Sequence, residues 1–321
     1  MNRIRAWIPT VIDRKVRVLA WLSLVSEVII VGTGGAVRLT ESGLGCSTWP
    51  TCSPDSLVPT PELGIHGLIE FGNRLMTGVV GIIAVLVLVA LLRVRRDRPG
   101  LFGLAVAIVL AVAAQAVVGG ITVLSGLNPF IVGFHFVASL VLVVLSAILV
   151  VRCYAAPGRV RFVAPPWYVT ASFVTAALLS VTIMVGVLTT ASGPHSGDPN
   201  AARTGFDAFL LEHFHAWPGY VSFAAVVFLV VAAAARGLRS ASWTVVLLLL
   251  VLVQIAIGLI QANTGLPPLL VGAHMILACL VAATMAVVVL WELEPSASGR
   301  ADEGQNGSSG SIATARKSTV R

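Results

Sequence analysis

The chain has 321 residues, of which 57% are hydrophobic and only 11% are charged, and this composition excludes an ordinary soluble domain. The formal net charge is +7, but the basic residues gather between long apolar segments, where they indicate membrane orientation rather than nucleic-acid binding. We therefore expect an integral membrane protein in contact with the lipid bilayer, with no nucleic-acid partner.

Eight apolar segments are each long enough to cross a hydrocarbon core of about 30 Å as a helix. In chain order we expect them near residues 17–37, 75–92, 101–123, 130–151, 168–190, 216–235, 241–262 and 269–291. Residues 1–16 are predicted to be a cytoplasmic N-terminal segment without a removable signal peptide, and residues 152–167 a cytoplasmic linker. Residues 292–321 are rich in Ser, Gly and charge, which predicts a disordered cytoplasmic tail.

Lys and Arg are distributed very unevenly among the connecting segments. Eighteen of the 21 lie at the N-terminus, in the 93–98, 152–161 and 236–239 connections, or in the C-terminal tail. Only Arg38, Arg74 and Arg203 lie on the opposite side. The positive-inside rule therefore predicts that both termini are cytoplasmic, in a multi-pass protein of a bacterial inner membrane.

Residues 115–135 and 254–274 repeat one pattern at an offset of 139 residues without a gap. Nine positions are identical, and they include a Gln, a Pro, several Gly and the final His135 and His274. We interpret the chain as two repeats of four helices, over residues 17–151 and 168–291. The predicted fold is therefore all-α, with eight transmembrane helices arranged as two pseudo-twofold-related four-helix bundles.

Histidines gather at the outer ends of the predicted helices. Imidazoles that project from two facing helices can bind the iron of a heme from both sides. In the second repeat, Glu212-x-x-His215 opens a helix, so we expect His215 and His274 to be axial ligands, with His213 as a competitor for the first position.

The first repeat departs from this pattern, because its matching segment reads Glu70-x-x-Asn73. His135 is the expected ligand there, and His66 can reach the same helix face as Asn73. Glu70 is either a helix cap or a proton acceptor beside a partly open heme position, and it is our candidate catalytic residue.

Three further outer-side or buried features carry predictions. Arg38 and Arg74 are cations that can pair with heme propionates. Glu27 lies in the middle of the first span, where an ionisable residue is a functional candidate, but its partner is not identified. Cys46 and Cys52 lie in one outer loop, GCSTWPTC, and are predicted to form a disulfide whose role is either structural or redox.

Several segments together resemble the heme A synthase family (CtaA-type), particularly its actinobacterial members, over roughly residues 17–291. They are GTGGAVRLTESGLGCSTWPTC, IEFGNRLMTG, VGFHFVAS and VGAHMILA, together with TTASGPHSGD and HFHA. The resemblance implies a heme b in the C-terminal half, held by His215 and His274. It also implies a substrate heme O in the N-terminal half, at a site formed by His135, His66, Asn73, Arg74 and Arg38, with Glu70 as the catalytic residue.

The implied reaction oxidises a methyl substituent of heme O to the formyl group of heme A, with oxygen drawn from water. The implied partners are a heme O synthase and the assembly of an aa3-type cytochrome oxidase. The electron acceptor is not identified by the sequence, which is also compatible with a homo-oligomer.

One departure from the family matters, because many members carry His where this chain has Asn73. Either His66 takes its place, or one face of the substrate heme stays open. The alternative function is a diheme membrane cytochrome b that passes electrons between quinol and an outer-side acceptor. That function would favour two matched bis-His sites, so Asn73 argues against it.

Overall fold

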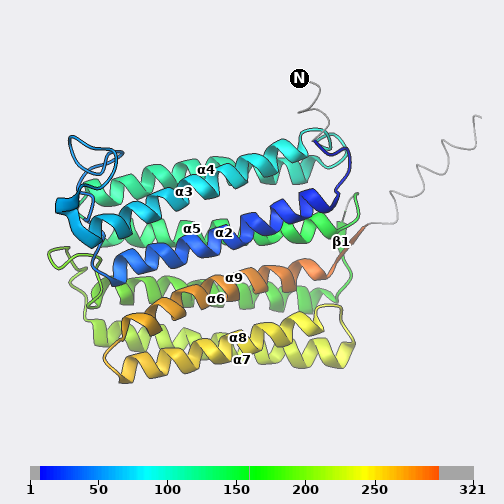
Figure 1. Cartoon of the computed structure of the whole chain (residues 1–321). Helices are drawn as coiled ribbons and strands as arrows, with labels where there is room; N and C mark the ends of the chain where they lie inside the picture. Colours follow the sequence, from blue (N-terminus) through cyan, green and yellow to red (C-terminus); the bar gives the residue numbers. More distant parts are fainter. Residues whose placement is uncertain (1–7, 159, 296–321) are drawn as a thin grey trace, which may run out of the picture.

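The fold is given by a computed structural model that describes residues 8–158 and 160–295. Over these residues, eight long helices lie side by side and run in alternating directions, with the longest loops at one end (Figure 1). The helices are α2 Arg14–Leu39, α3 Gly64–Leu91, α4 Pro99–Leu124, α5 Pro129–Tyr154, α6 Pro166–Ser192, α7 Ala208–Arg236, α8 Ala241–Asn263 and α9 Pro268–Trp291. A short 3₁₀ helix, η1 Pro61–Leu63, precedes α3.

All eight helices are long and apolar enough to cross a membrane. Large apolar side chains point outward along them, as Leu110 and Leu269 do with exposed fractions of 65% and 88%. Exposing such an apolar surface to lipid has little cost in free energy, whereas exposing it to water is unfavourable. The prediction of a multi-pass, all-α membrane protein with eight spans is therefore confirmed.

Two helices begin well before the predicted apolar segments. α3 begins at Gly64 rather than near residue 75, and α7 begins at Ala208 rather than near residue 216. Apolarity detects only the part of a helix that lies in hydrocarbon, whereas backbone hydrogen bonds continue through polar residues. At α7 the side chain of Asp207 accepts a hydrogen bond from the Leu210 backbone N–H, which caps the early start.

The helices contact one another in two rings of four. α2, α3, α4 and α5 form the first ring, and α6, α7, α8 and α9 form the second. Each ring encloses its own apolar core, and a third cluster that includes Val31, Val143 and Cys279 lies where the rings meet. The two rings join mainly through α9, which packs against both α5 and α2.

The turn within each sequence repeat has the same backbone conformation. Gly126 and Leu127 both have positive φ, at 62° and 59°, and Gly265 and Leu266 do so at 77° and 60°. The Leu127 and Leu266 N–H groups donate to carbonyls five residues earlier, each over 2.8 Å. A left-handed leucine is uncommon, so its presence in both copies shows that the duplication extends to the backbone.

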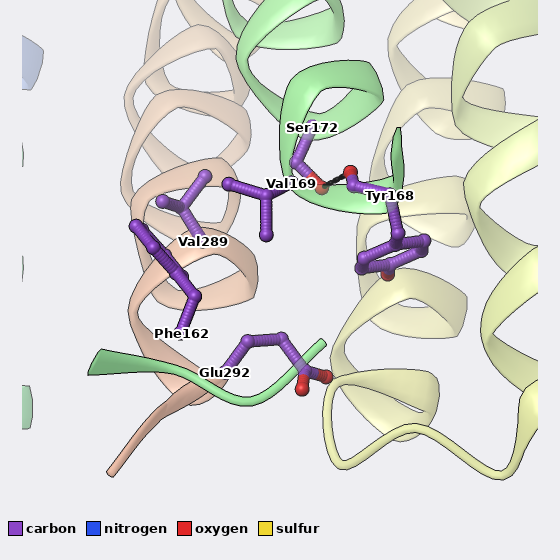
Figure 2. A pocket seen from close by; sticks show the side chains of 6 residues that line it. All are labelled: Phe162, Tyr168, Val169, Ser172, Val289 and Glu292. Atoms are coloured by element: carbon purple, nitrogen blue, oxygen red, sulfur yellow. Dashed lines mark hydrogen bonds between the residues drawn. The ribbon is translucent and has the colours of Figure 1, made fainter. Parts of the chain in front are cut away.

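The other end of the bundle is closed by a small strand pair. β1 Val160–Phe162 pairs antiparallel with β2 Leu293–Pro295, and buried Glu292 accepts a hydrogen bond from the Ser240 backbone N–H over 2.8 Å. Figure 2 shows the small pocket behind this pair, between the start of α6 and the end of α9. It is lined by Phe162, Tyr168, Val169, Ser172, Val289 and Glu292.

This strand pair corrects the predicted boundary of the disordered tail. Residues 292–295 were expected to be disordered, but their backbone pairs with residues 160–163 across the end of the bundle. Composition alone could not reveal this partner, because it comes from a distant connection. The rest of the predicted tail, residues 296–321, and residues 1–7 of the predicted N-terminal segment lie outside the described residues.

Candidate functional site

Two histidines of the C-terminal half face each other near its loop-rich end. His215 comes from α7 and His274 from α9, and their ring centroids lie 6.3 Å apart with the planes at 72°. The Nδ1 of His215 donates to the Thr182 carbonyl on α6 over 2.9 Å. This hydrogen bond leaves the Nε2 lone pair of His215 for a metal, which is the usual arrangement of an imidazole ligand.

Glycines make room for both rings. A Cβ atom on Gly186 would lie 2.7 Å from Cε1 of His215, and one on Gly258 would lie 3.2 Å from Cε1 of His274. The Nδ1 atom of His274 is buried and has no hydrogen-bond partner among the described residues. A buried polar atom without a partner is costly, so this ring lacks something that the folded chain alone does not supply.

The separation of the two rings fits a shared metal. Two metal–imidazole bonds of about 2 Å, with about 1 Å more from each nitrogen to its ring centre, put the centroids about 6 Å apart. Among the described residues there is no cluster of three or more His, Cys, Asp or Glu side chains that could hold a metal ion by themselves. The donor set therefore fits a heme better than a bare metal ion.

His213 is directed elsewhere. Its ring is exposed, its Nδ1 donates to the Phe209 carbonyl over 2.8 Å, and its centroid lies 4.5 Å from that of Phe209. His215 rather than His213 therefore lies opposite His274.

His135 of the N-terminal half is held as His274 is. Gln115 donates through Nε2 to the His135 carbonyl over 2.8 Å, and Gln254 donates to the His274 carbonyl over 3.1 Å. A Cβ atom on Gly119 would lie 3.3 Å from Cε1 of His135, whose Nδ1 is also buried without a partner among the described residues. The repeated Gln, Gly and His of the sequence thus make the same contacts in both halves.

The position of the N-terminal half that matches His215 is occupied by Asn73, which is not a histidine. Asn73 on α3 accepts a hydrogen bond through Oδ1 from the Thr33 hydroxyl of α2, over 2.7 Å. The two halves therefore share one histidine position and differ at the other.

Glu70 and Arg74 fold the disulfide loop onto α3. The predicted Cys46–Cys52 disulfide is present. Glu70 is buried, with one carboxylate oxygen accepting from the Cys46 backbone N–H over 2.6 Å and the other from Arg74. Arg74 also donates to three loop carbonyls, those of Cys46, Thr48 and Thr51.

The same loop places Trp49 against the helix that supports His135. The Trp49 ring contacts Gly120 of α4, and the neighbouring Gly119 contacts the His135 ring. The loop therefore covers the N-terminal site from the loop-rich end of the bundle, and the Glu70–Arg74 pair holds it there.

The other predicted site residues have partners that the sequence did not indicate. Arg38 donates to the His195 and Thr190 carbonyls, over 2.6 and 2.8 Å, and so connects α2 to the last turn of α6 and to the loop after it. His66 is exposed, with its Nδ1 2.9 Å from the Ser42 hydroxyl. Glu27 is 2% exposed, and its Oε1 has no partner among the described residues. The predicted roles of Arg38 and His66 at a heme stay predictions, as does the predicted functional role of Glu27.

A family model described as "Cytochrome oxidase assembly protein", COX15-CtaA, matches residues 17–194, more than half of the chain. The chain belongs to the COX15-CtaA family. The match covers α2 to α6 and therefore contains Glu70, Asn73 and His135, whereas His215 and His274 lie beyond it. For those two residues the support is the internal repeat and the ring geometry.

Curated relatives of this COX15-CtaA protein include heme A synthases from three genera. The Lysinibacillus sphaericus protein is 38% identical over 132 residues, which is 39% of this chain and 41% of the relative. Those from Listeria welshimeri and Geobacillus thermodenitrificans are each 30% identical, over 39% and 43% of this chain. The chain spans less than half the length of these relatives, and their sources do not support the expected likeness to actinobacterial members.

Three residues that position the candidate ligands were not predicted from the sequence. Thr33 and Thr182 position Asn73 and His215, and Gly186 makes room for the His215 ring. The repeat contained a signal for the last of these, because Gly34 and Gly186 are each the twenty-first residue of their helix. An alignment of α2 with α6 would have found this pair.

Proposed function

We propose that this chain is a heme A synthase, an oxidoreductase that converts a methyl group of heme O into the formyl group of heme A for an aa3-type cytochrome oxidase. One observation carries the proposal: a membrane scaffold of the COX15-CtaA family builds the same histidine site twice and completes it with a second histidine only once. Such asymmetry suits one resident heme and one heme that is exchanged as a substrate.

The reaction has a definite balance. The methyl carbon gains one oxygen from water, and four electrons and four protons leave. The electrons pass to an external acceptor. We propose that Glu70 accepts a proton during this oxidation, because it is the buried carboxylate of the N-terminal half that lies at the disulfide loop covering the site.

In the C-terminal half, we propose that His215 and His274 hold a resident heme b, which supplies electron transfer when bound. His215 is oriented by the Thr182 carbonyl, and both rings lie against glycine backbone. The positions of the two rings are thus set by four helices, α6, α7, α8 and α9.

The surroundings of the reaction follow from the charge pattern and the family. We propose that both termini are cytoplasmic in a bacterial inner membrane, because 18 of the 21 Lys and Arg residues belong to the terminal segments and connections that the positive-inside rule assigns to one side. Heme O then comes from a heme O synthase, and heme A passes to cytochrome oxidase assembly.

The test is pigment chemistry. The full chain is expressed with a heme O synthase in a host that makes no heme A, and the extracted hemes are separated. We expect heme A only when both proteins are present, with heme O accumulating when this chain is omitted. A folded, heme-loaded protein that yields only heme B and heme O overturns the proposal.

The same experiment separates the alternative, a diheme cytochrome b. That function favours two imidazoles on each heme, and Asn73 supplies none opposite His135. A cytochrome would reduce and reoxidise its hemes without changing their substituents, so the formation of heme A excludes it as the full account.

A further inference from the structure

Asn73 in the N-terminal half corresponds to His215 in the C-terminal half. Asn73 follows Glu70 by three residues on α3, as His215 follows Glu212 by three residues on α7. Each side chain lies against the twenty-first residue of the preceding helix. A Cβ atom on Gly34 would lie 3.9 Å from the Asn73 amide, and one on Gly186 would lie 2.7 Å from the His215 ring. Asn73 and His215 therefore occupy equivalent places.

Their hydrogen bonds lie near corresponding backbone carbonyls. His215 donates to the carbonyl of Thr182, the seventeenth residue of α6. The seventeenth residue of α2 is Ile30, and its carbonyl lies 3.1 Å from the Thr33 hydroxyl, which also bonds Asn73. A threonine hydroxyl and a shorter side chain thus take the place of an imidazole that would bond this carbonyl directly.

The hydrogen bond to Thr33 engages only one of the two polar atoms of the Asn73 carboxamide. The other makes no hydrogen bond to any residue that the structure describes. A carboxamide is a poor ligand for heme iron, but its free atom can hydrogen-bond a small molecule at that position. The side chain therefore suits an open axial position rather than a second iron ligand.

His66 does not supply the missing imidazole. It precedes Asn73 by seven residues, which places it about 10 Å away along the axis of α3. Its exposed ring bonds the Ser42 hydroxyl, and its backbone carbonyl packs against Gly45 of the disulfide loop. Bringing His66 to the level of Asn73 would require the first turns of α3 and this loop to be rebuilt.

We propose that the N-terminal half binds its heme through His135 alone, with the Asn73–Thr33 pair keeping the opposite axial position free of any protein imidazole. The inference rests on the proposed function for the identity of the bound heme, heme O, but its ligand set rests on the geometry. A single histidine ligand also accounts for the exchange of the substrate heme. This heme must leave after each turnover, and one iron–imidazole bond is easier to break than two. The resident heme of the other half is held by both.

Reciprocal substitutions test the ligand set. The full chain is loaded with heme B as the probe in both halves, and its ferric spin states are measured by electron paramagnetic resonance and optical spectroscopy. We expect equal amounts of high-spin and low-spin heme in the unaltered protein. Asn73→His should convert the high-spin half to low-spin, and His215→Asn should convert the low-spin half to high-spin.

Two controls keep the experiment decisive. Asn73→Ala removes the carboxamide without adding a ligand, so its N-terminal heme should stay high-spin. His66→Ala should also leave the spin states unchanged. Two low-spin hemes in the unaltered protein overturn the proposal, as does an Asn73→His spectrum that is unchanged while the low-spin signal of the C-terminal half shows a folded protein.

The spin-state measurement does not depend on catalytic turnover. Spin states are read with heme B, which requires no oxidation of a methyl group. If the reciprocal changes occur but coexpression yields no heme A, the ligand set stands and the proposed function falls. If heme A forms but the unaltered protein contains only low-spin hemes, the proposed function stands and this inference falls.

Discussion

At the scale of single residues, Glu70 has one structural role in the fold and one proposed role in catalysis. Both of its carboxylate oxygens are engaged, one by the Cys46 backbone and one by Arg74, so it holds the disulfide loop in place. It is also a buried carboxylate beside the proposed substrate site, where proton transfer is required. A substitution at Glu70 alone would not distinguish these roles, whereas a matched change at Arg74 does.

We predict that Glu70→Gln lowers the rate of heme A formation by about 100-fold or more, the usual loss when a general base is removed. Arg74→Lys keeps a positive charge beside Glu70 but loses the forked contacts with the loop carbonyls, so we expect a loss of less than about tenfold. Rates are measured in membranes and normalised to the low-spin heme b signal. Equal losses in the two variants would mean that Glu70 acts only through the loop.

At the scale of helices, the candidate sites depend on close approach between histidine rings and glycine backbone. Gly186 on α6 contacts His215 of the neighbouring helix α7, and Gly258 on α8 contacts His274 of the neighbouring helix α9. A methyl group at Gly186 would overlap the His215 ring, so the ring must move and its bond to the Thr182 carbonyl must weaken.

Gly186→Ala should therefore weaken heme b retention. Overpacking of this kind costs about 1–3 kcal/mol, which corresponds to roughly a tenfold loss of affinity or more. Gly219→Ala on α7 is the matched control, because its Cβ atom would meet nothing closer than 3.7 Å. Heme b per protein is measured by absorbance after washing in detergent. Equal retention in both variants would show that the glycine contact does not set the ring position.

Helices were the part of the fold that the sequence predicted best. The centre of each span followed from its apolarity, but the onsets of α3 and α7 did not, because charged and polar residues interrupt the apolar ones in their first turns. Those turns carry Glu70, Asn73 and His215. The spacing of Asn73 from Glu70 and of His215 from Glu212 could still be compared between the two repeats. The candidate ligands were therefore predicted although the helix boundaries were misplaced.

At the scale of the whole molecule, hydrogen bonds between the long loops connect the two halves at the loop-rich end. The Gly43 N–H donates to the Gly197 carbonyl over 2.7 Å, which joins the first long loop to the second. His195 donates through Nε2 to the Leu266 carbonyl over 2.8 Å and accepts from Arg38 through its own carbonyl. The histidines of both candidate sites lie in the first turns of α5, α7 and α9, near these loops, so the side of the membrane that this end faces decides where the proposed chemistry occurs.

The charge pattern predicts that this end faces away from the cytoplasm. Asn200→Cys introduces an exposed thiol in the second long loop, and Asp97→Cys introduces one at the opposite end. The native Cys153 and Cys279 are buried and should react little. In spheroplasts, a membrane-impermeant maleimide should label Asn200→Cys at once and Asp97→Cys only after permeabilisation. The reverse order would overturn the predicted orientation.

The sequence by itself determined the eight spans, the duplication, the disulfide pair and the histidines that distinguish the two halves. Each of these is encoded locally: in the apolarity of one segment, in a motif that occurs twice, or in two cysteines that share one short loop. Tertiary structure decided what those residues touch. Arg38 bonds a carbonyl 157 residues away, and β2 pairs with a connection that precedes it by more than 100 residues. Such contacts depend on how the two rings of helices pack, and no local pattern records that packing.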